Sequence, residues 1–186
     1  MNTEQALKDA RDRMDKALDV LKNELKGLRT GRASPALLDA LRVEYYGQQT
    51  PIKQLAAVTA PEAQQLLIKP FDVAALKDIE KAIRSSDLGL APDNDGKVIR
   101  LKIPPMSGEQ RTKMVKKVKE LAEAAKVSCR NIRRDSNKVV ETAEKDKIIS
   151  EDESKKTKDK IQDVLKQYEG KVDEVATAKT KEIQEG

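Results

Sequence analysis

Apolar residues recur at steps of three and four in two separate parts of this chain, residues 1–28 and residues 106–186. In the first part the series comprises Leu7, Ala10, Met14, Ala17, Leu18, Leu21, Leu25 and Leu28. A repeat of about 3.5 residues is typical of a helix with one narrow apolar stripe, which must be buried against other helices. Asn2 or Thr3 can cap the start of this helix.

Two further helices are predicted after residue 106. Ser107 with Gln110 and Ser150 with Glu153 each form a capping-box pattern, which marks a helix start. The expected apolar stripes comprise Met114, Val118, Leu121, Ala122, Ala125, Cys129, Ile132, Ser136, Val139 and Ala143, and then Ile161, Val164, Leu165, Tyr168, Val172 and Val175. We expect the three helices to form a long antiparallel bundle within one chain. A dimeric coiled coil is the alternative, but the many Ala, Ser and Cys residues favour close antiparallel packing.

Residues 31–105 show another pattern. Ile99, Leu101 and Ile103 alternate with charged residues, which predicts a strand with one buried face. Further strands are expected over residues 43–46, before a turn at Gly47–Gln48, and over 55–59 and 66–69. Asp72 is expected to cap a short helix whose buried face holds Val73, Leu76, Ile79 and Ile83, and residues 92–96 are expected to form a turn.

The predicted fold class is therefore α+β, with two domains. Residues 1–30 and 106–186 form the three-helix bundle, and residues 31–105 form a small inserted α/β domain. Because the insert leaves and re-enters the bundle, its ends near Gly31 and Pro104–Pro105 must lie close together. Two adjacent connections are a natural hinge, since Gly31 supplies backbone freedom while the prolines restrict it.

The composition argues against an enzyme. The chain has no His and one Cys, Cys129, which excludes His-based nucleophile pairs and multi-cysteine metal sites. No glycine loop for phosphates is present, and residues 92–96 lack the acidic positions of a calcium loop. We expect no cofactor, no metal and no catalytic residue. No targeting signal or membrane span is visible, so a cytoplasmic protein is expected.

Positive charge is concentrated in one segment. The net charge is +5, and residues 106–149 contain 12 Lys or Arg against 7 Asp or Glu. On an ideal helix their basic and polar side chains form a stripe beside the apolar one: Lys116, Lys119, Lys126, Arg130, Arg133, Arg134 and Asn137. Such a stripe is typical of polyanion binding, and the lack of aromatic platforms favours folded RNA over single strands.

The alternative is that acidic side chains neutralise these arginines. Within the helix, Asp135 should face elsewhere, and Glu120 and Glu123 lie more than one turn away from Arg130. We therefore expect the stripe to be available for RNA.

Several motifs together resemble the ribosome recycling factor family, over essentially the whole chain. They are residues 28–38 (LRTGRASPALL), 43–47 (VEYYG), 81–83 with 86–90 (KAI, SDLGL), 103–105 (IPP) and 126–135 (KVSCRNIRRD). The RTGRASP and RNIRRD stretches, in this order, are the most specific.

The resemblance implies an L-shaped, monomeric translation factor of near-tRNA dimensions. It would bind the post-termination ribosome and, with elongation factor G and GTP, split the subunits for a new round of initiation. Arg130, Arg133 and Arg134 would contact large-subunit rRNA. The hinge residues would be Arg29, Thr30, Gly31, Arg32, Pro104 and Pro105.

From the residues alone, two other functions remain open. The first is a helical scaffold that binds partner helices through its apolar stripes. The second is a general RNA chaperone, which would bind arbitrary duplex RNA as well as ribosomes.

Overall fold

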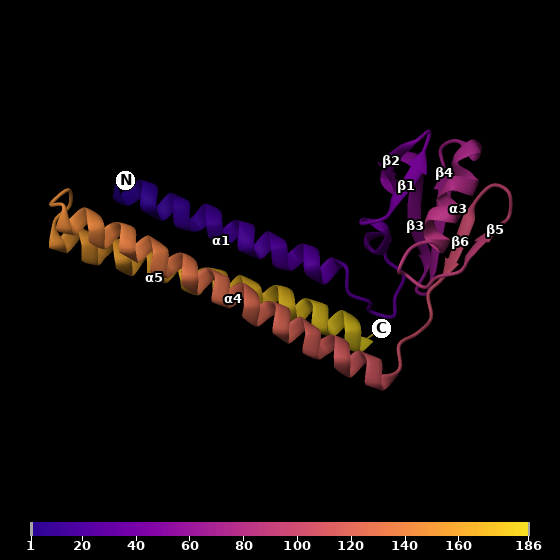
Figure 1. Cartoon of the computed structure of the whole chain (residues 1–186). Helices are drawn as coiled ribbons and strands as arrows, with labels where there is room; N and C mark the ends of the chain where they lie inside the picture. The colour runs from indigo at the N-terminus through magenta and orange to yellow at the C-terminus, as the bar shows by residue number, and fades with distance from the viewer. Residues whose placement is uncertain (1, 186) are drawn as a thin grey trace. The chain divides into compact units, whose positions relative to one another are not determined.

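Three long helices carry the predicted apolar stripes. The computed structural model describes residues 2–185 and contains α1 (Thr3–Lys26), α4 (Gly108–Lys145) and α5 (Glu151–Glu185). They lie side by side, with α4 antiparallel to α1 and α5 (Figure 1). The three stripes are thus buried against one another within one chain, which confirms the predicted bundle.

Side-chain caps define where the three helices begin. Gln5 N donates to Asn2 Oδ1 at 2.8 Å, and Asn2 N donates to Gln5 Oε1 at 3.0 Å. Ser107 with Gln110 and Ser150 with Glu153 form the same reciprocal pair of bonds. These capping boxes satisfy N–H groups that have no partner inside the helix, so the predicted helix starts are confirmed.

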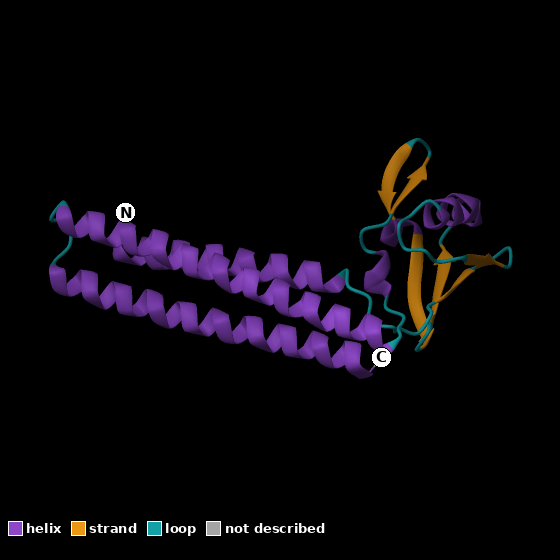
Figure 2. Cartoon of the chain, turned by 60° about the horizontal axis from the view of Figure 1, so that its bottom comes forward, coloured by secondary structure: helices purple, strands orange, loops and turns teal. Residues whose placement is uncertain are grey.

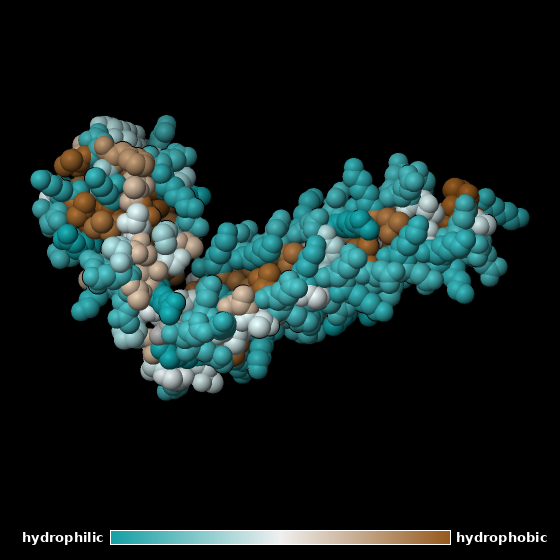
Figure 3. All heavy atoms as spheres, turned by 180° about the vertical axis from the view of Figure 1, so that it is seen from behind, coloured by the Kyte–Doolittle hydropathy of each residue, from teal (hydrophilic) through white to brown (hydrophobic). Residues whose placement is uncertain are grey.

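The buried face of α4 differs from the prediction at one position. Val140 is 2% exposed, whereas Val139, which the pattern placed in the stripe, is 37% exposed. The apolar stripe shifts by one residue because 3.6 residues per turn drifts away from a strict 3.5 repeat. The outer surface of the helical bundle is hydrophilic in the view of Figure 3, except for a narrow apolar strip along its length.

The remaining elements form two small antiparallel sheets with short helices (Figure 2). One sheet pairs β1 with β2, and the other has the order β3-β4-β6-β5. The bounds are η1 (Pro35–Leu38), β1 (Arg42–Tyr45), β2 (Gln48–Pro51), α2 (Ile52–Leu55), β3 (Ala56–Glu62), β4 (Gln65–Pro70), η2 (Val73–Ala75), α3 (Leu76–Arg84), β5 (Pro92–Asn94) and β6 (Ile99–Lys102). Their common core includes Leu38, Ile68, Ile79 and Ile99, all fully buried.

Three local predictions in this region were wrong. The hairpin turn lies at Tyr46–Gly47, one residue earlier than expected, because both residues have the positive φ values of 49° and 76° that a tight two-residue turn requires. Pro92–Asn94 forms an edge strand on β6, where a proline is tolerated. Val73 is 62% exposed, because it lies in η2, before the amphipathic part of α3 begins.

Internal contacts divide the chain into two compact units. One runs to Leu25 and resumes over Val115–Glu182, and the other covers Lys26–Met114 and the chain end from Ile183. These divisions fall within the ends of α1, α4 and α5, whereas the sequence analysis placed the boundaries at 30/31 and 105/106.

Candidate nucleic-acid interface

The predicted basic stripe lies on α4, to one side of its buried face. Val118, Ala125 and Cys129 on the buried face fix the rotation of the helix. Asp135 on one flank of α4 receives a hydrogen bond of 2.9 Å from Arg13 of α1, while Lys126, Arg130 and Arg133 of the basic stripe contact α5. The seven side chains of the stripe differ in exposure. Lys116, Lys119 and Arg134 are exposed, while Lys126, Arg130, Arg133 and Asn137 are half-buried.

Carboxylates neutralise the middle of the stripe. Lys126 Nζ lies 2.6 Å from Asp173 Oδ1 on α5. Arg130 bonds to Glu123 on its own helix at 3.1 Å and to Glu169 on α5 at 3.5 Å. The expectation that Glu123 is too distant was wrong, because a residue seven positions earlier lies on the same helix face two turns away, within reach of a long arginine. The hydrogen bond to Glu123 raises the pKa of Arg130, so this guanidinium stays charged.

Arg133 has a different kind of partner. Its Nη1 donates to the amide oxygen of Gln162 on α5 at 3.0 Å. A neutral amide orients the guanidinium without cancelling its charge. Arg133 therefore remains a full positive charge held in a fixed direction.

The cations at the two ends of the stripe differ from those in its middle. Within residues 2–185, no carboxylate lies within 4 Å of the charged groups of Lys116, Lys119 or Arg134. Arg134 and Asn137 line one shallow hollow with Lys138, a further exposed cation, together with Asn131 and the carboxylates Asp135 and Glu141. An exposed cation has a low free-energy cost of desolvation when it binds a phosphate, so it is available to RNA.

Three α5 residues that shape this surface were not predicted from the sequence: Gln162, Glu169 and Asp173. The antiparallel pairing of α4 with α5 could have predicted them. In an antiparallel helix hairpin, residues further along one helix lie opposite residues earlier in the other. The ion pairs Lys158–Glu141, Arg130–Glu169 and Lys126–Asp173 all follow that single register, set by the short turn before Ser150.

The six predicted hinge residues come together around one pocket, of about 320 Å³, inside the second compact unit. Residues 27–34 and 103–107, which contain all six, lie outside helices and strands. Gly31 has a φ of 78°, a conformation that other residues rarely adopt. Leu37, Leu88, Leu90 and Ile103 supply an apolar wall to this pocket.

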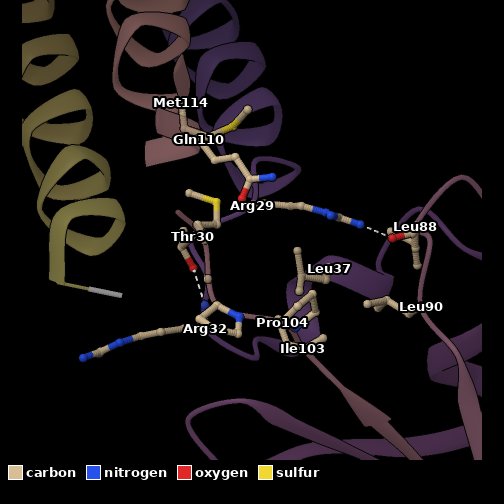
Figure 4. A pocket seen from close by; sticks show the side chains of 13 residues that line it. Arg29, Thr30, Arg32, Leu37, Leu88, Leu90, Ile103, Pro104, Gln110 and Met114 are labelled. Atoms are coloured by element: carbon tan, nitrogen blue, oxygen red, sulfur yellow. Dashed lines mark hydrogen bonds between the residues drawn. The ribbon is translucent and has the colours of Figure 1, made fainter. Parts of the chain in front are cut away.

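Hydrogen bonds hold the two connecting segments near each other. Ala33 N donates to Ala63 O at 2.7 Å, and Ile103 N donates to Gln64 O at 2.8 Å, so both segments are fixed to the same turn between β3 and β4. The Arg29 guanidinium donates to the Leu88 carbonyl, whereas Arg32 bonds through its N–H to Thr30 Oγ1 and extends its side chain away (Figure 4). The closeness expected for the ends of the insert is therefore confirmed.

Other kinds of site find no support in the part of the chain that the structure describes. No group of three potential ligands could hold a metal ion there, and none of its helices is long and apolar enough to cross a membrane. Cys129 is fully buried, and this burial raises the pKa of its thiol. The fold and the surface thus define a helical-bundle protein with a cationic helix face and a small inserted α/β module.

Comparison with known proteins gives the family. The model of the ribosome recycling factor family matches residues 21–183. The factor of Symbiobacterium thermophilum is 49% identical over 98% of this chain and 99% of its own length, and that of Rhodopirellula baltica is 62% identical over 74% of each. The chain belongs to the ribosome recycling factor family.

Solved structures agree with this assignment. The solution structure of a ribosome recycling factor matches with a TM-score of 0.83 and 39% identity, over 100% of this chain and 99% of the other. A model of the T. thermophilus factor, bound with E. coli elongation factor G to the E. coli post-termination complex, matches with a TM-score of 0.71 and 44% identity, over 98% and 99%. The predicted α+β fold class is confirmed.

Proposed function

We propose that this protein binds the post-termination ribosome through the basic stripe of α4 and, with elongation factor G and GTP, splits the subunits. The observation that carries the proposal is the set of cations at the two ends of the stripe that form no ion pair within residues 2–185: Lys116, Lys119, Arg133 and Arg134. Large-subunit rRNA is the partner that fits, because folded RNA presents phosphates at fixed positions to a rigid helix. The T. thermophilus relative bound with elongation factor G supports the choice of partners.

In this proposal the protein acts mechanically, and the energy comes from the GTPase. Arg29, Thr30, Gly31, Arg32, Pro104 and Pro105 form the hinge through which the inserted module moves relative to the bundle. Burial of the apolar stripes within a single chain supports a monomer. The proposal also places the protein in the cytoplasm and assigns it no cofactor or metal.

The test is a pelleting assay with vacant ribosomes over a range of salt concentrations. Replacing Arg133 and Arg134 with Ala should weaken binding, and each lost phosphate contact should reduce the slope of log affinity against log salt by about one. The fold should persist, since the variant loses only the hydrogen bond from Arg133 to Gln162 and neither arginine forms an ion pair within residues 2–185. Binding that is unchanged at every salt concentration would contradict the proposal.

The alternative functions predict other results. A scaffold would form a stable oligomer that light scattering detects. An RNA chaperone would bind ribosomes and arbitrary duplex RNA with similar affinity.

A further inference from the structure

Arg29 joins the first connecting segment, residues 27–34, to a distant loop of the inserted module. Its guanidinium Nη2 donates a hydrogen bond to the carbonyl oxygen of Leu88, which is 59 positions away in the chain (Figure 4). Leu88 lies in the loop between α3 and β5. Both residues belong to the same compact unit, so this bond fixes the segment to the module.

The bond extends the part of the segment that the module holds. Ala33 is fixed by its backbone bond to Ala63, whereas the N–H of Arg32 bonds only to Thr30 within the segment. Within residues 2–185, the Arg29 bond is the only hydrogen bond that joins residues 27–32 to the module. Without it, this stretch would be attached only through Ala33.

The loop presents the Leu88 carbonyl to the arginine. Gly89 has a φ of 66°, and a Cβ built on it would lie 3.6 Å from Arg29 Nη2, so the side chain passes directly over this turn. No backbone N–H within residues 2–185 donates to Leu88 O. Because a carbonyl without a partner costs free energy, the arginine supplies an interaction that the loop itself lacks.

The same bond is open to competition from an anion. Arg29 is exposed and forms no ion pair within residues 2–185. The Leu88 carbonyl is a neutral acceptor, whereas a phosphate carries charge and accepts two parallel bonds from one guanidinium. A phosphate that reaches Arg29 therefore binds it more strongly than the carbonyl does.

We infer that Arg29 is a releasable latch: it holds the first connecting segment on the inserted module and leaves Leu88 when a phosphate group binds its guanidinium. This inference rests on the proposed function, in which the phosphate belongs to rRNA and the module moves relative to the bundle. Once the bond is broken, the backbone dihedral angles of residues 27–32 can change. Because the phosphate binds only the released state, its binding increases the population of that state.

The test measures the distribution of distances between two spin labels by electron paramagnetic resonance. The full chain carries Cys129→Ala, with labels on Lys16→Cys in α1 and on Lys97→Cys in the turn between β5 and β6, both exposed positions. Arg29→Met removes the donor and keeps an apolar chain of similar length. The matched control is Arg42→Met, which removes the same charge from an exposed arginine of β1.

Arg29→Met should broaden the distance distribution at least about 1.5-fold, since losing a hydrogen bond from a charged group shifts the ratio of latched to released molecules roughly tenfold. Arg42→Met should leave the distribution unchanged. Inorganic polyphosphate added to the labelled protein with Arg29 intact should broaden its distribution to the width seen for Arg29→Met. The same addition should not broaden the distribution of Arg29→Met further.

Equal distributions in the two variants would overturn the inference. So would polyphosphate that leaves the protein with Arg29 unchanged, or that broadens both proteins to the same extent. The proposed function has separate tests. Ribosome binding by R133A/R134A decides the role of the basic stripe, and a disulfide between cysteines at positions 31 and 105 decides whether splitting needs the hinge motion.

Discussion

Arg133 on α4 and Gln162 on α5 are joined by a hydrogen bond of 3.0 Å between Nη1 and Oε1. The guanidinium is thus positioned by a group without charge. Arg130, three residues earlier on α4, is instead held by the carboxylates of Glu123 and Glu169. This difference distinguishes a cation that lies between carboxylates from one whose side-chain partner is uncharged.

Replacing Gln162 with Glu should convert this hydrogen bond into an ion pair. Ribosome binding should weaken about threefold to tenfold at low salt, because the new carboxylate cancels the charge of Arg133. The free energy of unfolding should rise by no more than about 1 kcal/mol, as for other partly exposed pairs. Pelleting and denaturant unfolding measure the two effects. Gln167→Glu, at an exposed position of α5, supplies the same charge as a control, and equal losses from both variants would refute the local role of Gln162.

A disulfide across the hinge should block splitting of the ribosomal subunits without preventing ribosome binding. Cysteines at positions 31 and 105, in a protein with Cys129 replaced by Ala, allow the two connecting segments to be joined. The oxidised protein should still bind ribosomes but should no longer split them with elongation factor G and GTP. The reduced form of the same variant is the control, because it carries any strain from replacing Gly31. Full splitting activity in the oxidised form would exclude the hinge motion.

Tyr168 should make the stability of the bundle depend on pH in the alkaline range. Burial, followed by the hydrogen bond to Asp15, raises its pKa from 10.0 to about 12. The folded state therefore holds this proton more tightly than the unfolded chain does. Its contribution to stability is complete below pH 10 and is lost as the pH rises from 10 to about 12.

Denaturant unfolding across that pH range measures the loss, and Tyr168→Phe should abolish this part of the pH dependence. The same variant should lower the free energy of unfolding by about 1 kcal/mol at neutral pH, since it removes the hydrogen bond to Asp15. Ultraviolet titration of the Tyr168→Phe variant should lack the tyrosine ionisation that occurs at the highest pH in the unchanged protein. If that step persists, Tyr168 is not the residue that titrates there.

The capping box at the start of α5 should contribute measurably to the free energy of unfolding. Ser150→Ala removes the side-chain acceptor for Glu153 N, a bond of 3.1 Å, and should lower the free energy of unfolding by about 1 kcal/mol. Ser128→Ala, at an exposed position within α4, should leave it nearly unchanged. Equal effects of the two substitutions would show that the cap does not stabilise the helix.

Local patterns allowed much of this fold to be predicted. The helix starts follow from Ser107 and Ser150, because a capping box involves residues only three positions apart. The strand at residues 99–102 follows from strict alternation of Ile99 and Leu101 with charged residues. The errors occurred where a local rule competes with its surroundings, as at Val139, where helix drift moved the buried position to Val140, and at Pro92–Asn94, where pairing with β6 turned a predicted turn into a strand.

The order of residues along the chain determined the three helices, the inserted α/β module and the helix that carries the cationic face, because each depends on interactions between near neighbours or on residue type. Only the tertiary structure decided which of those cations lie beside carboxylates of another helix. Arg130 and Glu169 are 39 positions apart, and packing of α4 against α5 brings them together. An ion pair depends on distance in space, so the chemical character of this surface arises only when the helices have packed.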